Sequence, residues 1–151
     1  MFYGDKKMKL TSPAFKHYGA IPAKFTCDGA DLSPALEISD VPESTKSLVL
    51  IVDDPDSRSK TWLHWLVYDI NPLSRIPEGD VPGKQGMNDF GKRDYNGPCP
   101  HTGRHRYFFR LHALDSTLGL KEGASRKDVE KAMEGHVLER TELLGLYERN
   151  R

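Results

Sequence analysis

The sequence lacks any long hydrophobic run, because nowhere in its 151 residues do apolar side chains continue for the roughly 18 positions that a membrane-spanning helix needs. The N-terminal residues include lysines but no apolar segment after them, so a secretory signal is not expected. Together these absences predict a soluble, cytoplasmic protein with no integral association with a membrane.

An excess of charge of one sign is also lacking. Lys and Arg total 22, Asp and Glu total 22, and the two signs are interspersed along the chain. Nucleic-acid binding depends on a basic face that neutralises phosphates, so we expect no nucleic-acid partner. A local site for a small anion is compatible with this balance.

Cysteine is scarce, with only Cys27 and Cys99 present. No C-x-x-C spacing points to a metal or redox motif. The two residues could form one disulfide, but cytosolic thiols are normally reduced. We therefore predict two free thiols.

The length bounds the domain organisation, because 151 residues suffice for one domain with a proper core but not for two. Residues 1–9 are expected to be a loose N-terminal extension. Residues 10–151 are expected to form a single domain, and they contain no internal repeat.

Short strands joined by ordered turns dominate the predicted secondary structure, since ten prolines and 13 glycines are spread along the chain. Residues 48–52 and 62–70 are apolar runs of the kind that form buried strands. Shorter strands are predicted at 24–27 and 36–38. From His105 onward the residues alternate with period two, so that one face carries Tyr107, Phe109, Leu111 and Ala113 and the other carries Arg106, Phe108, Arg110 and His112.

One helix is predicted to begin after Ser125, a suitable N-cap with Asp128 three residues on. Residues 141–147 could continue as helix or form a last strand, and their even spacing of apolar residues favours the strand. The domain is thus expected to be mainly β, with one or two peripheral helices. Without a βαβ rhythm, a Rossmann-type fold is disfavoured.

The first candidate for chemistry lies between the two apolar runs. Asp53, Asp54 and Asp56 follow one run, and His64 lies in the next beside Trp62 on the same face. A carboxylate beside an imidazole raises its affinity for a proton, and the pair can then offer a charged N–H donor to an anion. The competing interpretation is a solvated acidic turn beside a buried structural histidine.

The second candidate is the segment 95–107. Gly97 allows close backbone approach, while Pro98 and Pro100 stiffen the chain, conceivably with a cis bond. Such a corner can present backbone N–H groups to a ligand. Taken alone, however, it is better explained as a structural turn that leads into a core strand.

Two further chemistries are open but weakly supported. Histidines 64, 101 and 105 with Asp54 or Asp56 could bind a metal, although the two nearest histidines lie in a glycine-containing loop rather than on a helix. Cys99 could act as a nucleophile with His105 as its base, but no oxyanion donor is identifiable. We predict no metal, no cofactor and no catalytic residue.

These segments resemble a known family. The motifs are Asp54-Pro55-Asp56, Trp62-Leu63-His64, Tyr95-Asn96-Gly97-Pro98 and His105-Arg106-Tyr107, preceded by the pattern from Ile21-Pro22 to Gly29 and by Ser33-Pro34. Their order and spacing resemble the phosphatidylethanolamine-binding protein family, also called Raf kinase inhibitor protein-like, and its shorter bacterial and archaeal branch in particular. The resemblance runs from about Leu10 to Arg149.

The resemblance implies a large central antiparallel sheet packed on a smaller one, with a small anion-accepting pocket at one end. The ligand would be phosphate, acetate or a phospholipid headgroup such as phosphorylethanolamine. The protein would be a non-enzymatic binding protein, for which a regulatory role is open. By carry-over, the pocket would be lined by Asp54, Trp62, His64, Gly97, Pro98, His105 and Tyr107, with Asp56 supporting the loop.

The resemblance also implies a homodimer. A second hypothesis is that the protein inhibits or modulates a protease or kinase through surface docking, with residues 71–91 as the contact. Three positions depart from the family pattern. His101 replaces a proline and could add a donor at the pocket mouth, whereas Ala35 and Ile38 replace residues of the rim and packing. The loop at 57–61 is shorter than in eukaryotic members.

Overall fold

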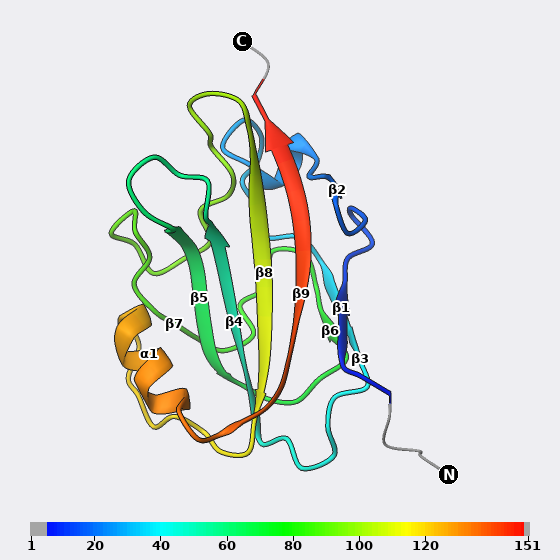
Figure 1. The fold of residues 1–151 in the computed structure, drawn as a ribbon, viewed down its shortest axis with the longest axis vertical. Helices are drawn as coiled ribbons and strands as arrows, with labels where there is room; N and C mark the ends of the chain where they lie inside the picture. The colour runs from blue at the N-terminus through cyan, green and yellow to red at the C-terminus, as the bar shows by residue number, and fades with distance from the viewer. Residues whose placement is uncertain (1–5, 150–151) are drawn as a thin grey trace.

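The computed structural model describes residues 6–149 as a mainly β domain with two sheets and one α-helix. The bounds are β1 Lys9–Thr11, β2 Gly19–Ala20, β3 Leu36–Ser39, β4 Ser47–Asp54, β5 Trp62–Ile70, β6 Arg75–Ile76, β7 Lys84–Gln85, β8 Arg104–Leu114, α1 Arg126–Met133 and β9 Val137–Glu148. Figure 1 shows the long strands β5, β4, β8 and β9 running side by side, with α1 beside β5 and the short strands β1 and β3 beyond β9.

The larger sheet has the strand order β2-β9-β8-β4-β5-β7, and the smaller has the order β1-β3-β6. All neighbouring strands are antiparallel except β2 and β9. The predicted fold class, a large central antiparallel sheet packed on a smaller one, is thereby confirmed.

Strand β4 holds the sheet together because every one of its eight residues is buried. Alternation sends Leu48, Leu50 and Val52 into the core between the two sheets. Val49 and Ile51 face the opposite way, into a second cluster beneath α1. Burial on both faces explains why residues 48–52 form an unbroken apolar run rather than an alternating one.

The C-terminal part of the chain follows its sequence pattern closely. Ser125 caps α1, since its Oγ accepts a hydrogen bond from the Asp128 amide at 3.1 Å. The helix ends at Met133, and Gly135 adopts a left-handed φ of 80° that turns the chain. Strand β9 then includes the segment 141–147, so the preference for a last strand there was correct.

The N-terminal part of the chain bears on two predictions, a strand at residues 24–27 and a loose segment at residues 1–9. Residues 24–27 do not form the predicted strand, because Pro22 sets φ at −61° and its carbonyl accepts from the Phe25 amide, which starts a 3-10 turn at Ala23–Phe25. Of the expected loose segment 1–9, residues 1–5 lie outside the described part of the chain. Met8 belongs to the core and Lys9 begins β1.

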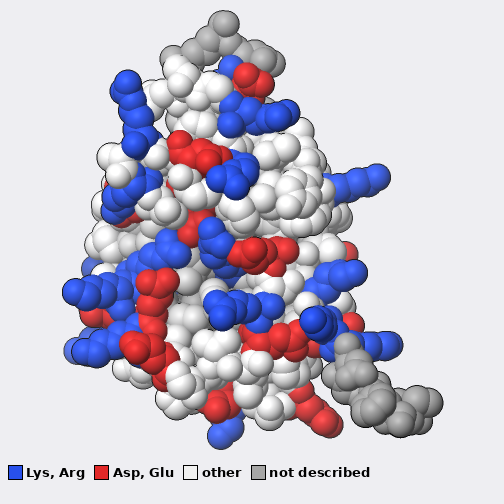
Figure 2. Space-filling view, in the orientation of Figure 1, with Lys and Arg blue, Asp and Glu red and all other residues white. Residues whose placement is uncertain are grey.

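Charges of both signs cover the face shown in Figure 2, where Lys and Arg alternate with Asp and Glu over the described part of the chain. This distribution matches the interspersed pattern of the sequence. No helix within residues 6–149 is long and apolar enough to cross a membrane.

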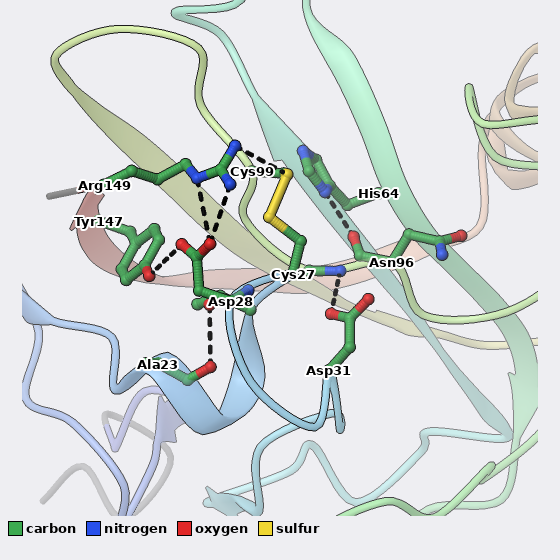
Figure 3. The surroundings of a disulfide bond; sticks show 11 residues. Ala23, Cys27, Asp28, Asp31, His64, Asn96, Cys99, Tyr147 and Arg149 are labelled. Carbon is green, nitrogen blue, oxygen red and sulfur yellow. Dashed lines mark hydrogen bonds and ion pairs between the residues drawn. A yellow bond between two sulfur atoms is a disulfide. The ribbon is translucent and has the colours of Figure 1, made fainter. Parts of the chain in front are cut away.

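The prediction of two free thiols was wrong, because Cys27 and Cys99 form a disulfide (Figure 3). Their Cα atoms lie 5.5 Å apart although 72 positions separate them in the sequence. The backbone brings them together, since the Cys27 amide donates to the Pro98 carbonyl at 3.1 Å. The disulfide therefore joins the segment after the 3-10 turn to the corner that precedes β8.

The long loop closed by this disulfide leads to a stability prediction. A cross-link across a loop of this size restricts the unfolded chain, and we expect its removal to lower the free energy of unfolding by about 4 kcal/mol. Urea unfolding of the oxidised protein, with and without a dithiol reductant, measures the difference. The Cys27→Ser/Cys99→Ser variant should match the reduced protein and not respond to reductant, and equal midpoints for oxidised and reduced wild type would contradict the prediction.

Candidate functional site

A cavity of about 510 Å³ opens at the end of the larger sheet where β4 stops and where β5 and β8 begin. Antiparallel pairing places these three chain positions together, because Asp54 lies opposite Trp62 and Asp53 lies opposite Phe108. The lining residues are Asp54, Asp56, Ser57, Arg58, Ser59, Trp62, His64, Phe90, Cys99, Pro100, His101, Thr102, His105 and Tyr107. The two predicted segments thus meet at one cavity.

Asp54 is almost fully buried, with 3% of its surface exposed. Its Oδ2 lies 2.7 Å from Nδ1 of His105, and its Oδ1 accepts the Asp56 amide at 2.7 Å. The predicted pair of carboxylate and imidazole therefore forms with His105 rather than with His64. Because a carboxylate only accepts, the Nδ1–H of His105 is the donor.

His64 is equally buried and takes a different partner. Its Nδ1 lies 2.5 Å from the carbonyl oxygen of Asn96, which can only accept, so Nδ1 carries the proton. Burial lowers the pKa of His64 below its usual range, and the Asn96 hydrogen bond and the charge of Asp54 oppose that shift. His64 therefore favours the neutral form, in which Nε2 is a hydrogen-bond acceptor.

Tyr107 lies between the two histidines. Its ring is 5.4 Å from that of His64 and 6.4 Å from that of His105. The side chain is 1% exposed, and its hydroxyl makes no hydrogen bond of ordinary geometry within residues 6–149, although it lies near the Asp54 carboxylate and the Cys99 backbone. Burial, followed by the nearby charge of Asp54, raises the pKa of the phenol, so the hydroxyl keeps its proton and is available as a donor.

An aromatic wall completes one side of the cavity. Trp62 and His64 share it as predicted from their alternation, and the Phe90 ring lies 5.7 Å from Trp62 and 5.2 Å from His64 in edge contacts. Phe90 comes from the loop after β7, and its backbone N–H donates to the side chain of the buried Asn88. These rings give the cavity an apolar side. It lies next to a polar floor, which is formed by Asp54, His64, His105 and Tyr107.

Asp56 supports the loop after β4 rather than offering free oxygens. It accepts hydrogen bonds from the amide, Nε and Nη2 of Arg106 at 2.8 to 2.9 Å. Those contacts lower the pKa of Asp56, with the side-chain hydrogen bond from Arg106 as the largest cause. The arrangement matches the loop-supporting role expected for this residue.

Gly97 and Pro98 were predicted to line the pocket, but both are buried behind its wall. The Gly97 amide donates to Oδ1 of Asp31 at 2.8 Å, so it does not point at a ligand. A Cβ at position 97 would meet the carbonyl oxygen of Phe25 at 2.2 Å, which explains the glycine. Every peptide bond in the described range is trans, including those preceding the prolines at 98 and 100.

Asp53 was grouped with Asp54 and Asp56 in the sequence, but it faces the opposite side of the sheet. It is fully buried there and pairs with Arg110 at 3.0 Å and Arg126 at 2.9 Å. Adjacent residues of a strand point to opposite faces, so only Asp54 reaches the cavity. Asp53 instead ties β4 to β8 and to the start of α1.

Several residues of this site were not predicted from the sequence. Asp31 holds the Gly97 amide in the wall, and the Asn96 carbonyl orients His64. Arg58, Phe90 and Thr102 line the cavity. All five lie in loops, where no periodicity indicates which way a side chain points. The sequence left open whether His101 joins the pocket, and the structure places it in the lining of the cavity.

Two alternative chemistries find little support in the geometry. Within residues 6–149 no group of three or more His, Cys, Asp or Glu side chains is arranged to hold a metal ion. The sulfur of Cys99 is bonded to Cys27, so it is not a free nucleophile for His105 to activate.

The fold and the cavity define a class of protein, a two-sheet β domain with a ligand-sized pocket at one end of its larger sheet. The family model for phosphatidylethanolamine-binding protein matches residues 11–148. The chain is 50% identical over 159 residues to a UPF0098 protein of Pyrococcus horikoshii, covering 97% of this chain and 80% of that one. It is 50% identical over 153 residues to a UPF0098 protein of Methanothermobacter thermautotrophicus, covering 94% and 99%.

Solved structures of proteins from this family have the same fold as this chain. A phosphatidylethanolamine-binding protein homologue from Chlamydia trachomatis, CT736, superposes with a TM-score of 0.93 at 42% identity and covers 95% of this chain and 99% of its own. Escherichia coli YbcL, described as a new member of the mammalian family, gives 0.87 at 27% identity, with coverages of 96% and 100%. The chain belongs to the phosphatidylethanolamine-binding protein family.

The buried histidines make stability depend on pH. Burial lowers the pKa of His64 and of the half-buried His112, so the unfolded chain binds more protons as the pH falls through about 6.5. We therefore expect the free energy of unfolding to decrease from pH 7.5 to pH 5.5, by up to about 1.4 kcal/mol per pH unit for each histidine.

Urea unfolding at fixed ionic strength measures this slope, and the variant His112→Gln isolates the share of His64. The slope should become smaller in His112→Gln but keep its sign. Stability that is constant or rises toward pH 5.5 in that variant would show that His64 is not held in its neutral form.

Proposed function

We propose that this protein is a non-enzymatic binding protein whose cavity accepts a small anionic group, such as phosphate, a carboxylate or phosphorylethanolamine. One observation carries the proposal: the hydroxyl of Tyr107 is buried at the cavity without a partner among the described residues, between two histidines whose rings are already fixed by Asp54 and Asn96. A bound oxygen would supply the missing acceptor.

An anion bound in the cavity would give the Tyr107 hydroxyl a hydrogen-bond acceptor. A buried hydroxyl without a hydrogen bond costs roughly 1–3 kcal/mol, and a hydrogen bond to a charged acceptor contributes roughly 1.5–3 kcal/mol. His64 and His105 can add charge-assisted donors from Nε2 when they are protonated. Trp62 and Phe90 would then cover the apolar part of a larger ligand, such as the ethanolamine carbons.

Binding is favoured over catalysis by the chemistry of the residues near the histidines. Catalysis by a nucleophile requires a side chain that a base can activate at hydrogen-bond distance. His64 and His105 direct their Nδ1 atoms to Asn96 and Asp54, and Cys99 is in a disulfide. The side chains around the two histidines therefore favour binding of the anionic group over its chemical conversion.

The variant Tyr107→Phe tests the proposal, because it should lower the affinity for the anion without lowering the stability of the fold. We expect affinity for phosphorylethanolamine to fall roughly tenfold, because a donor to the anion is lost. The same change should leave stability unchanged or raise it by about 1 kcal/mol, because it removes an unsatisfied buried group. NMR titration of the histidine ring signals measures the affinity, and urea unfolding measures the stability.

The exposed Tyr18 offers a matched control, since Tyr18→Phe removes a hydroxyl outside the cavity and should alter neither quantity. If the signals of both His64 and His105 in the wild type stay fixed at millimolar phosphate and phosphorylethanolamine, the proposal is wrong.

An alternative is that the protein inhibits or modulates a protease or kinase by surface docking. Val81, Met87 and Phe90, large apolar side chains that are exposed, all lie within the segment 71–91 expected to make that contact. A partner captured stoichiometrically by the wild type and by Tyr107→Phe, but not by Val81→Ser/Met87→Ser, would favour docking over pocket binding. A regulatory role and a homodimer stay proposals carried over from the family resemblance, and a cytoplasmic location stays a proposal based on the sequence.

A further inference from the structure

The floor of the cavity has more hydrogen-bond acceptors than donors when its histidines are neutral. Asn96 and Asp54 fix the proton of each imidazole on Nδ1, so the Nε2 atoms of His64 and His105 are both acceptors. The carboxylate of Asp54, with 3% of its surface exposed, also lines the cavity, and its Oδ2 accepts the Nδ1–H of His105. Among the buried side chains of this lining, the hydroxyl of Tyr107 is the one that offers a donor to the cavity.

An oxyanion without a proton is poorly matched to this floor. One of its oxygens can accept from Tyr107, but its other oxygens would face imidazole nitrogens and a carboxylate that are also acceptors. Unpaired acceptors and like charges in a desolvated site oppose binding and are a common basis of selectivity. One proton placed between the floor and the oxyanion turns a repulsive contact into a charge-assisted hydrogen bond.

We propose that this pocket requires one proton at the contact between its floor and the bound oxyanion, and that it therefore selects phosphate, which carries an ionisable proton, over sulfate, which does not. The inference rests on the proposed function and adds the chemical class that the same site accepts. Phosphate supplies the proton itself, whereas sulfate binds only when a histidine takes a proton from solution.

The charged groups around the floor do not cancel this requirement. Around His64 lie the charges of Asp54, Asp31 and Asp53, and His105 lies beside Asp54 and near Asp56. Asp56 is already paired with Arg106. Arg58 and His101 are exposed parts of the lining and attract phosphate and sulfate alike, so they add affinity without discriminating between the two.

The test compares sodium phosphate and sodium sulfate at pH 8 and equal ionic strength, by calorimetry and by the NMR signals of the histidine rings. Both ions are then mainly dianions of similar size, so the bound proton is their principal difference. We expect sulfate to bind roughly 10- to 100-fold more weakly at pH 8, the cost of one missing charged hydrogen bond. The ratio should shrink as the pH falls, because sulfate binding takes up a proton from solution.

Calorimetry in two buffers of different ionisation enthalpy counts the protons exchanged. Sulfate should bind with uptake of about one proton and inorganic phosphate with much less, since it brings its own proton. Equal affinities at pH 8, or sulfate binding without proton uptake, would overturn this inference and leave the proposed anion site intact. Binding of neither ion at millimolar concentration would overturn both.

The variant Asp54→Asn extends the test, because it removes the negative charge from the floor and should reduce the preference for phosphate at pH 8. Asp115→Asn is a matched control at the opposite end of β8, where it removes one exposed carboxylate and should leave the ratio unchanged. An unchanged ratio in a folded Asp54→Asn protein would contradict the role given to Asp54, and the wild-type comparison stands even if that variant does not fold.

Discussion

Two consecutive carboxylates are buried at the end of β4, and their pairing is the constraint on which both faces of the sheet depend. A buried charge that loses its partner costs about 3–5 kcal/mol, so each carboxylate has to be matched. Asp53 is matched by Arg110 and Arg126, which fix α1 against β8. Asp54 accepts hydrogen bonds from the His105 ring and from the Asp56 amide, and these contacts fix the floor of the cavity. One dipeptide therefore connects the fold to the site.

The fold supplies rigidity that the site then uses. Strand β4 is buried on both faces, so its end cannot shift without disturbing two cores. That rigidity explains how the protein tolerates a Tyr107 hydroxyl that has no hydrogen-bond partner within residues 6–149. Local features that oppose stability in this way concentrate at functional sites, because surrounding structure holds them in place. The unmatched hydroxyl is thus better evidence for binding than the cavity itself.

The sequence predicted elements well where periodicity decides them, and it failed where long-range pairing does. Alternation placed Trp62 with His64 and His105 with Tyr107 correctly. It could not reveal that Asp54 pairs with His105, because that contact depends on β4 and β8 being neighbours in the sheet. The disulfide was missed for a similar reason, since 72 positions separate its cysteines and the argument from cellular compartment pointed the other way. Disulfides also occur in intracellular proteins of hyperthermophiles. The expectation that cytosolic thiols are reduced therefore could not decide the state of these two cysteines.

The wall of the cavity shows why a segment without chemistry of its own belongs to the site. The corner at 95–99 is held against residues 23–31 by four links: the Tyr95 hydroxyl to Phe25, the Gly97 amide to Asp31, the Cys27 amide to Pro98, and the disulfide. The same corner carries the Asn96 carbonyl that sets the proton of His64. The N-terminal pattern from Phe25 to Gly29 therefore acts on the cavity indirectly, by holding in place the group that makes Nε2 of His64 an acceptor.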